Sequence, residues 1–148
     1  IFDPFVNEKI INSFGGKKVD KLENAIKTAD FVSLHIPFNK DTKDLINLKV
    51  LKTMKRNSIL INTARGGVIN EKDLNLALND KIIFAAGLDV FEKEPPDIQN
   101  PLLTNERVLL SPHSATFTKE CKERMSIETI QNIIDFFENK VKKSMIVK

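Results

Sequence analysis

Short apolar segments alternate with amphipathic segments along this chain, and this alternation restricts the folds that it can adopt. Four segments are nearly continuously apolar, as strands covered on both faces should be: residues 31–36, 58–62, 82–91 and 108–110. Between them the apolar residues follow helical spacing. Strands that alternate with helices of this length predict a parallel sheet with right-handed crossovers. We therefore expect an α/β domain with a doubly wound parallel sheet.

Helical spacing and capping residues predict the position of each helix. We expect helices over residues 22–29, 48–55, 71–80 and 118–140. Asp20 and Glu23 form a capping-box pattern at the start of the first of these helices. The third starts after Asn70 and should bury Leu74, Ala77 and Leu78. The last and longest helix carries an apolar stripe that we interpret as core or domain packing.

The composition narrows the class of protein. With 148 residues, of which 41% are hydrophobic, the chain fits one domain with a sizeable core. A net charge of +3 reflects a small lysine surplus and argues against a nucleic-acid partner. The single cysteine, Cys121, excludes an intramolecular disulfide and argues against an oxidising compartment. No stretch approaches the roughly 20 apolar residues of a membrane span. We expect a cytoplasmic protein that binds no membrane.

The segment SILINTARGGVIN, residues 58–70, places an arginine directly after a predicted strand. A lone arginine in such a place commonly forms a surface ion pair. Ligands of doubly wound sheets, however, bind beyond the carboxyl ends of the strands. The planar fork of Arg65 matches a carboxylate, and Gly66 and Gly67 allow a sharp bend and a close ligand approach. Arg65 is therefore our candidate for binding an acid group.

Glu94 and His113 follow the next two predicted strands, within GLDVFEKEPP and SPHSAT. Taken singly, a glutamate before two prolines indicates a solvated loop, and one of two histidines is more often structural. Both residues are expected at the same edge of the sheet, and this placement favours a catalytic role. A carboxylate beside an imidazole determines which ring nitrogen is free. Together with Arg65 they would supply a carboxylate clamp and a proton-transfer pair. This set suits redox chemistry at a carbon that bears a hydroxyl next to a carboxylate.

No side chain can accept a hydride, so this chemistry requires an organic cofactor. Metal-ligand spacings are missing, because the sequence contains no CxxC or HExxH motif and its two histidines belong to separate strand-and-loop segments. Asp3, at the end of an apolar segment that we interpret as a strand, is a candidate acceptor for ribose hydroxyls. A turn formed before Pro4 explains Asp3 equally well, and the sequence leaves both interpretations open.

Four motifs resemble the NAD-binding domain of the D-isomer-specific 2-hydroxyacid dehydrogenases: DFVSLHIPFNKDTKDLIN, MKRNSILINTARGGVINEKDL, AAGLDVFEKEPP and NPLLTNERVLLSPHSATFTKE. The resemblance covers essentially the whole chain and implies a Rossmann-type fold, an NAD cofactor and hydride transfer between NAD and a D-2-hydroxy acid. NTARGGVINEKDL and LDVFEKEPP favour the phosphoglycerate dehydrogenase branch, which belongs to serine biosynthesis. SATFT after His113 departs from the Gly-Ala-Ser pattern common in that branch.

The resemblance also implies a role for each matching site residue. Arg65 would bind the substrate carboxylate, His113 would exchange the hydroxyl proton, and Glu94 would pair with His113. Asp3 would hold the adenosine ribose and favour NAD over NADP. The remaining cofactor contacts would come from His35, Pro37, Thr63, Ala64 and Asp89.

Two parts of the family's pattern are missing from these residues, namely the glycine-rich dinucleotide fingerprint and the substrate domain. We therefore expect residues 1–148 to be a partial dinucleotide-binding domain of a longer chain, without the first strand of the sheet and with little activity alone. The family also implies a homodimer. Related corepressors share the fold, so a non-catalytic NAD-binding module and an inactive fragment are the alternatives.

Overall fold

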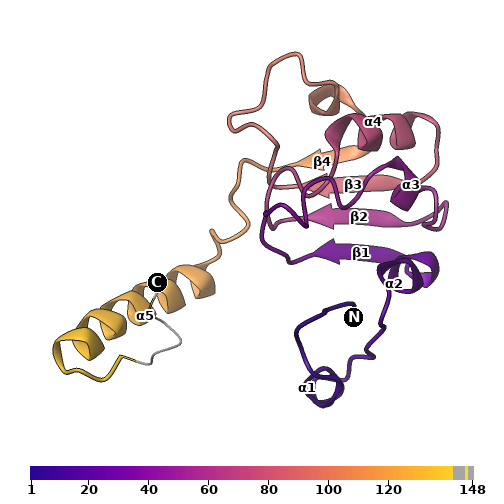
Figure 1. The fold of residues 1–148 in the computed structure, drawn as a ribbon. Coiled ribbons are helices and arrows are strands. Elements are labelled where there is room, and N and C mark those ends of the chain that lie inside the picture. The colour runs from indigo at the N-terminus through magenta and orange to yellow at the C-terminus, as the bar shows by residue number, and fades with distance from the viewer. Residues whose placement is uncertain (142–145, 147–148) are drawn as a thin grey trace. The chain divides into compact units, whose positions relative to one another are not determined.

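The computed structural model describes residues 1–141 and 146. These residues form two compact units, Ile1–His113 and the described part of Ser114–Lys148 (Figure 1). The first unit contains the sheet and every predicted site residue. The second unit is built around one long helix.

The predicted strands form one parallel sheet. Its members are β1 (Phe31–Leu34), β2 (Ile59–Asn62), β3 (Ala85–Leu88) and β4 (Val108–Leu110), in the order β1-β2-β3-β4 (Figure 1). The prediction of a parallel α/β fold is therefore confirmed. Because the four strands run in the same direction, the loops that follow them leave from the same edge of the sheet.

One face of this sheet carries the hydrophobic core. Leu60 and Ala86 are buried on that face, where they cluster with buried side chains of the neighbouring helices. These helices are α2 (Leu22–Thr28), α3 (Leu48–Leu51), α4 (Glu71–Asn79) and the 3-10 helix η1 (Pro101–Thr104). On the other face Phe31 is 67% and Leu109 80% exposed. The sequence predicted a sheet covered on both faces. Within this unit, only one face is covered.

Asparagine caps set the start of two predicted helices. Asn70 Oδ1 accepts the Asp73 N–H at 3.1 Å, and α4 begins at the next residue. Asn47 Oδ1 accepts the Val50 N–H at 3.2 Å, so α3 also begins where predicted, although it ends at Leu51. α4 buries the predicted side chains of Leu74, Ala77 and Leu78.

The capping box predicted at the start of α2 is wrong. This helix begins at Leu22, so Lys21 stands at the N-cap position and makes no capping hydrogen bond with its side chain. A capping box needs its acidic residue three positions after the cap, whereas Glu23 is two positions after Lys21. Asp20 lies one residue too far upstream to act as the cap.

The N-terminal segment differs from its prediction. Asp3 does not follow an assigned strand. Ile1 nevertheless donates to the Lys17 carbonyl at 2.6 Å and accepts from the Val19 N–H at 3.0 Å, which is the pattern of a parallel pair. The short helix α1 (Glu8–Ser13) lies between these residues. The sequence does not predict α1, because its apolar periodicity is weak. Ile11 is its only buried residue.

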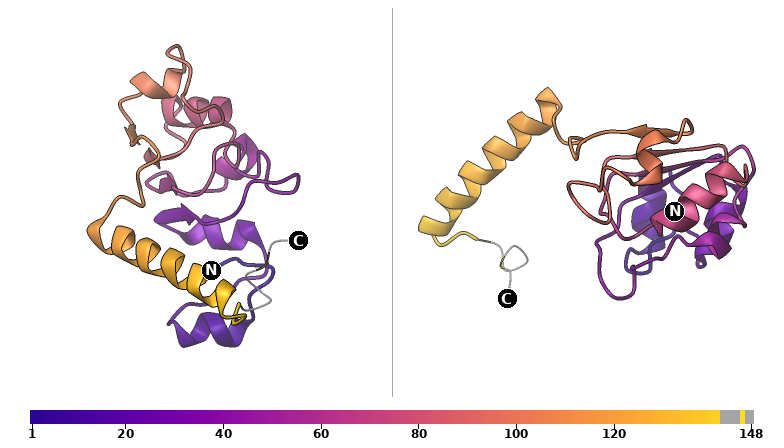
Figure 2. Two further views of the ribbon diagram at one scale, coloured as in Figure 1. Left: turned by 90° about the vertical axis from the view of Figure 1, so that its left-hand side faces the viewer. Right: turned by 90° about the horizontal axis from the view of Figure 1, so that it is seen from above.

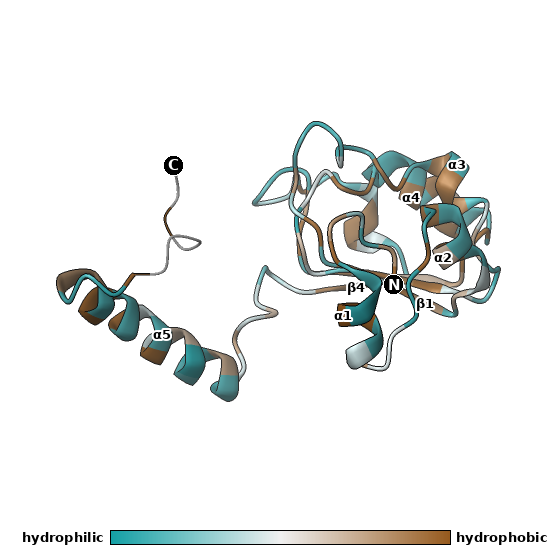
Figure 3. Cartoon of the chain, turned by 60° about the horizontal axis from the view of Figure 1, so that its bottom comes forward, coloured by the Kyte–Doolittle hydropathy of each residue, from teal (hydrophilic) through white to brown (hydrophobic). Residues whose placement is uncertain are grey.

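The second unit contains α5 (Lys119–Phe137), the longest helix of the described residues. Thr118 Oγ1 caps it by accepting the Cys121 N–H at 3.1 Å. Figure 2 shows α5 as one continuous helix, and Figure 3 shows apolar positions recurring between polar ones along it. None of its residues is buried, so the packing of its apolar stripe stays a prediction. No helix in the described part of the chain is long and apolar enough to cross a membrane.

Candidate active site

A glutamate and a histidine from two loops at the same edge of the sheet form a hydrogen-bonded pair. Glu94 follows β3, His113 follows β4, and Glu94 Oε2 lies 2.8 Å from His113 Nδ1. Their side chains are 39% and 51% exposed, so a ligand can reach the pair. Because the carboxylate engages Nδ1, Nε2 is the ring nitrogen available for proton exchange with a substrate.

The environment of Glu94 favours its ionised form. The hydrogen bond with His113 is the main reason that the pKa of Glu94 lies below its ordinary value of 4.5. The Phe91 N–H, which donates to Glu94 Oε1 at 3.1 Å, lowers this pKa further, while desolvation and the nearby charge of Asp89 raise it. Glu94 therefore remains a carboxylate at neutral pH and can hold a protonated imidazole.

We expect Glu94→Gln to lower the free energy of unfolding near neutral pH, by less than about 1 kcal/mol because solvent screens a half-exposed pair. A depressed pKa stabilises the folded protein fully above the ordinary value of 4.5, and this stabilisation is lost as pH falls through the lower folded-state pKa. Thermal unfolding followed by circular dichroism should therefore show the unfolding temperatures of the wild type and Glu94→Gln converging well below pH 4.5. A difference that stays constant down to acid pH would contradict this expectation.

Asp89 and Ser111 tie the carboxyl ends of β3 and β4 together. Ser111 Oγ donates to Asp89 Oδ1 at 2.5 Å, and the Ser111 N–H donates to the Leu88 carbonyl at 3.0 Å. Asp89 is 2% exposed and lies at the edge of the sheet where it was predicted. His113 comes two residues after Ser111 with a φ of +52°, which is uncommon for a residue other than glycine. Backbone strain of this kind clusters at functional sites.

The side chain of Asn62 shapes the loop that presents Arg65. Asn62 is 2% exposed at the end of β2, its Oδ1 accepts the Ala64 N–H at 3.0 Å, and its Nδ2 donates to the Arg65 carbonyl at 2.9 Å. The Arg65 side chain is exposed, and its Nη1 donates to the Ala64 carbonyl at 2.6 Å. A guanidinium has five N–H donors, so this bond leaves others for a ligand.

Gly66 allows the Arg65 loop to approach the loop that carries Glu94. A Cβ at Gly66 would lie 1.7 Å from the Phe91 carbonyl oxygen and 2.8 Å from the Glu92 nitrogen, so no side chain fits there. The two loops are therefore in backbone contact on the carboxyl side of the sheet.

A mostly apolar hollow of about 410 Å³ lies beside the Glu94–His113 pair. Apolar walls reduce the local dielectric constant, which strengthens hydrogen bonds made next to them. The side chains that make the hollow apolar are those of Phe91, Pro95, Pro96, Leu103, Leu110 and Pro112.

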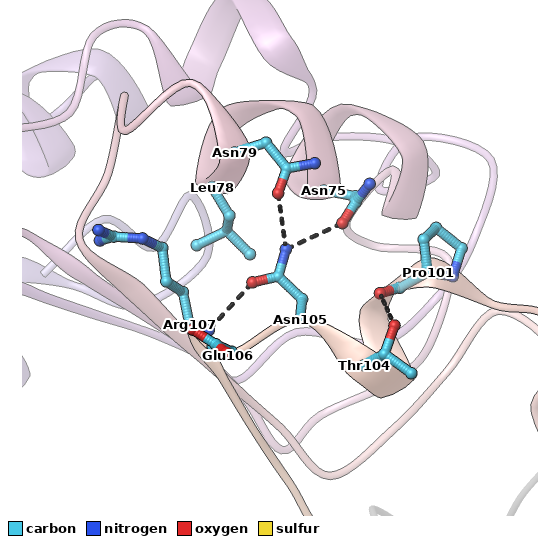
Figure 4. Close-up of a pocket in the computed structure, with 8 residues that line it drawn as sticks. All are labelled: Asn75, Leu78, Asn79, Pro101, Thr104, Asn105, Glu106 and Arg107. Carbon is cyan, nitrogen blue, oxygen red and sulfur yellow. Dashed lines mark hydrogen bonds between the residues drawn. The ribbon is translucent and has the colours of Figure 1, made fainter.

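A second hollow, of about 480 Å³, lies near the amino-terminal end of β4 (Figure 4). There Asn105 Nδ2 donates to Asn75 Oδ1 at 2.9 Å and to Asn79 Oδ1 at 3.2 Å. These hydrogen bonds join the residue that follows η1 to α4, at the edge of the sheet opposite the predicted site residues.

The other predicted cofactor residues lie at the carboxyl edge of the sheet. His35 and Pro37 follow β1, and Thr63 and Ala64 follow β2. His35 Nε2 lies 2.8 Å from Ser33 Oγ, in a part of the chain that is exposed. Doubly wound sheets bind dinucleotides across this edge, so the positions of these residues fit the cofactor.

Asp3 forms the turn that its sequence context allowed. Its Oδ1 accepts the N–H groups of Phe5 at 2.8 Å and Val6 at 3.0 Å, and these two bonds hold the pKa of Asp3 below its ordinary value of 3.8. Among the described residues no hydrogen bond to Asp3 Oδ2 is found. The turn therefore does not prevent a contact between Oδ2 and a ribose.

Comparison with known families identifies the fold to which these loops belong. Residues 1–115 match the family described as D-isomer specific 2-hydroxyacid dehydrogenase, NAD binding domain. The chain belongs to this family. The dehydrogenase family predicted from the sequence motifs is therefore confirmed, and with it NAD as the cofactor of the domain.

Relatives of this dehydrogenase domain match most of the chain. D-3-phosphoglycerate dehydrogenase of Methanocaldococcus jannaschii is 42% identical over 122 residues, which are 82% of this chain and 23% of the relative. Glyoxylate reductase of Korarchaeum cryptofilum is 41% identical over 125 residues, which are 84% of this chain and 38% of the relative. The chain thus spans less than half the length of both relatives.

A solved structure supports the same assignment to the dehydrogenases. The NAD complexed form of a D-isomer specific 2-hydroxyacid dehydrogenase from Lactobacillus delbrueckii ssp. bulgaricus matches with a TM-score of 0.83 and 28% identity. The match covers 97% of this chain and 47% of that one. It confirms the Rossmann-type α/β fold.

Sequence patterns missed two residues that hold the loops of this domain, Asn62 and Ser111. Asn62 could have been found, because an asparagine at the end of a buried strand is typical of a side-chain-stabilised turn. Ser111 gave no such signal, because its partner Asp89 is 22 residues away.

Proposed function

We propose that this domain is part of an NAD-dependent dehydrogenase that interconverts a D-2-hydroxy acid and its 2-keto acid. The observation that carries the proposal is the 2.8 Å contact between Glu94 and His113, at the edge of the sheet where Arg65 is also presented. A carboxylate-binding fork next to a proton-transfer pair is what this reaction requires.

Each residue in this proposal acts on one part of the substrate. The Arg65 guanidinium binds the carboxylate through paired N–H donors and polarises the oxygen at C2. His113 Nε2 accepts the proton of the C2 hydroxyl, and Glu94 stabilises the resulting imidazolium through Nδ1. NAD, when bound, supplies the hydride acceptor. The residues proposed to hold it are Asp3, His35, Pro37, Thr63, Ala64 and Asp89.

We infer that 3-phosphoglycerate is the first substrate to test. The motifs NTARGGVINEKDL and LDVFEKEPP favour the phosphoglycerate branch, which would place the enzyme in serine biosynthesis. Relatives named for phosphoglycerate and for glyoxylate are almost equally similar to this chain, at 42% and 41% identity. Glyoxylate, hydroxypyruvate and other small acids therefore belong in the same test.

The test is turnover of a panel of 2-hydroxy and 2-keto acids by the complete protein, followed through NADH absorbance. We expect one acid to be used and, where its hydroxy form is chiral at C2, kcat/KM to be at least about 100-fold higher for the D than for the L enantiomer, because a clamped carboxylate and a fixed base select one configuration. NADH binding without turnover of any acid would favour the corepressor-like alternative.

Asp3→Asn should weaken NADH binding about tenfold and lower the unfolding temperature only slightly, because the turn bonds are kept but now go to a neutral acceptor. Asparagine retains an Oδ1 that accepts the Phe5 and Val6 N–H groups, so the turn is kept. Its Nδ2 replaces Oδ2 and cannot accept hydrogen bonds from ribose hydroxyls. NADH fluorescence titration measures the first effect and thermal unfolding the second. Unchanged NADH affinity would mean that Asp3 forms the turn and does not bind the cofactor.

We also propose that the domain is the dinucleotide-binding part of a longer, cytoplasmic, homodimeric protein that includes a substrate domain. Support comes from the family, from the share of the relatives' length that the chain spans and from its single cysteine. Sedimentation of the complete protein tests the dimer.

A further inference from the structure

Two glutamates from distant parts of the chain exchange hydrogen bonds with each other's backbone. The Glu92 N–H donates to Glu71 Oε1 at 2.6 Å, and the Glu71 N–H donates to Glu92 Oε1 at 3.0 Å. Glu71 is the first residue of α4, and Glu92 lies in the loop that carries Glu94. The first residue of α4 thus both donates a hydrogen bond to the loop of the candidate active site and accepts one from it.

The second oxygen of Glu71 reaches a third segment. Asn100 Nδ2 donates to Glu71 Oε2 at 2.6 Å, while Asn100 Oδ1 accepts the Leu102 N–H at 3.0 Å at the start of η1. Glu71 therefore binds the first part of the 91–100 loop through one oxygen and its last residue through the other. We call Glu71, Glu92 and Asn100 the loop latch.

The needs of α4 alone do not explain the loop latch. Asn70 already caps this helix through the Asp73 N–H. An acidic residue in the first turn favours the helix dipole, but this does not require hydrogen bonds to the 91–100 loop. What the arrangement adds is a connection between the helix and the loop.

The loop is held on its other side as well. Gly66 is in backbone contact with Phe91 and Glu92, so these two residues are fixed between Gly66 and Glu71. Glu94 lies two residues further along, and its Oε1 accepts the Phe91 N–H at 3.1 Å. A shift at Glu92 would therefore move the Glu94 carboxylate relative to His113.

We propose that Glu71 is a positioning residue that holds the 91–100 loop through Glu92 and Asn100 so that Glu94 meets His113. The proposal rests on the proposed role of the Glu94–His113 pair. Glu71 touches no reacting group and acts through the loop.

Two glutamine variants separate the loop latch from an effect of charge, because each removes one carboxylate from the same place. In Glu71→Gln, one oxygen becomes an NH₂ group that must face either the Glu92 N–H or Asn100 Nδ2, so one hydrogen bond is lost in either orientation. In Glu92→Gln, the amide oxygen can still accept the Glu71 N–H. Glu92→Gln is therefore the matched control.

In the complete protein we expect Glu71→Gln to lower kcat about tenfold or more, because small displacements of catalytic groups are costly. NMR titration of the ¹³C-labelled Glu94 carboxyl should show its pKa rising toward the ordinary value as the contact with His113 loosens. Glu92→Gln should change kcat by less than about twofold and leave the Glu94 titration in place.

Unchanged kcat and an unchanged Glu94 titration in Glu71→Gln would overturn the proposal, as would equal losses in both glutamine variants. If Glu71→Gln does not fold, the same two measurements are made on Asn100→Ser. Serine can still cap η1 but is too short to reach Glu71, so the bond between Asn100 and Glu71 is lost. The Glu94 titration needs no turnover, so it tests the loop latch even if no acid is found to be a substrate.

Discussion

His113→Ala is expected to lower kcat of the complete protein by at least about 100-fold with the best acid of the panel. Alanine removes the group that accepts the hydroxyl proton, and a positioned acid/base contributes roughly 10² to 10⁴ in rate. The imidazole is bound through Nδ1 to Glu94 at 2.8 Å, and its side chain is 51% exposed. Its partner Glu94 is itself 39% exposed, so removing the imidazole leaves no unpaired charge in the interior. Steady-state kinetics over a range of pH measures the loss.

NADH affinity provides the internal control for His113→Ala. The proposed cofactor contacts come from other parts of the chain, namely Asp3, the loops after β1 and β2, and Asp89. Fluorescence titration should therefore give a dissociation constant within about twofold of the wild-type value. Activity retained within threefold, together with intact NADH binding, would assign the proton transfer to another group. Loss of both together would indicate a disturbed fold.

Local signals predicted the elements whose caps and apolar residues lie within a few positions of one another. Asn70 caps α4, and Leu74 is buried one turn later, so spacing alone located this helix. The capping box at Asp20 failed because a cap at Asp20 requires the helix to start at residue 21, whereas it starts at Leu22. α1 was missed because it buries one side chain only.

The candidate site was predicted through topology. Parallel strands bring their carboxyl ends to one edge, so Glu94 and His113 could be placed together although 19 residues separate them. The loop latch could not be predicted this way. Glu71 and Glu92 have side chains of like charge, and each binds a backbone N–H, a donor that nearly every residue possesses. Only the folded backbone shows which of these donors lies within reach.

Gly66→Ala is expected to lower the free energy of unfolding by about 3 kcal/mol or more, the upper range for an overpacked site. The new Cβ would lie 1.7 Å from the Phe91 carbonyl oxygen and 2.2 Å from its carbon. Both atoms belong to the backbone, so no side-chain rotation can make room. Relief requires the Arg65 loop and the Glu94 loop to separate, and kcat should therefore fall as well. Thermal unfolding and steady-state kinetics measure the two effects.

Gly87→Ala is the matched control, because it adds the same methyl group to the same sheet. A Cβ at Gly87 would lie 4.0 Å from its nearest neighbour, Ile61 Cγ1, and glycine within a strand is already unfavourable. This variant should unfold at or slightly above the wild-type temperature and keep its activity. If Gly66→Ala behaved in the same way, the two loops would not be in the contact from which the geometry at Glu94 and Arg65 is derived. A large loss confined to Gly66→Ala would show that the backbone contact holds the two halves of the site together.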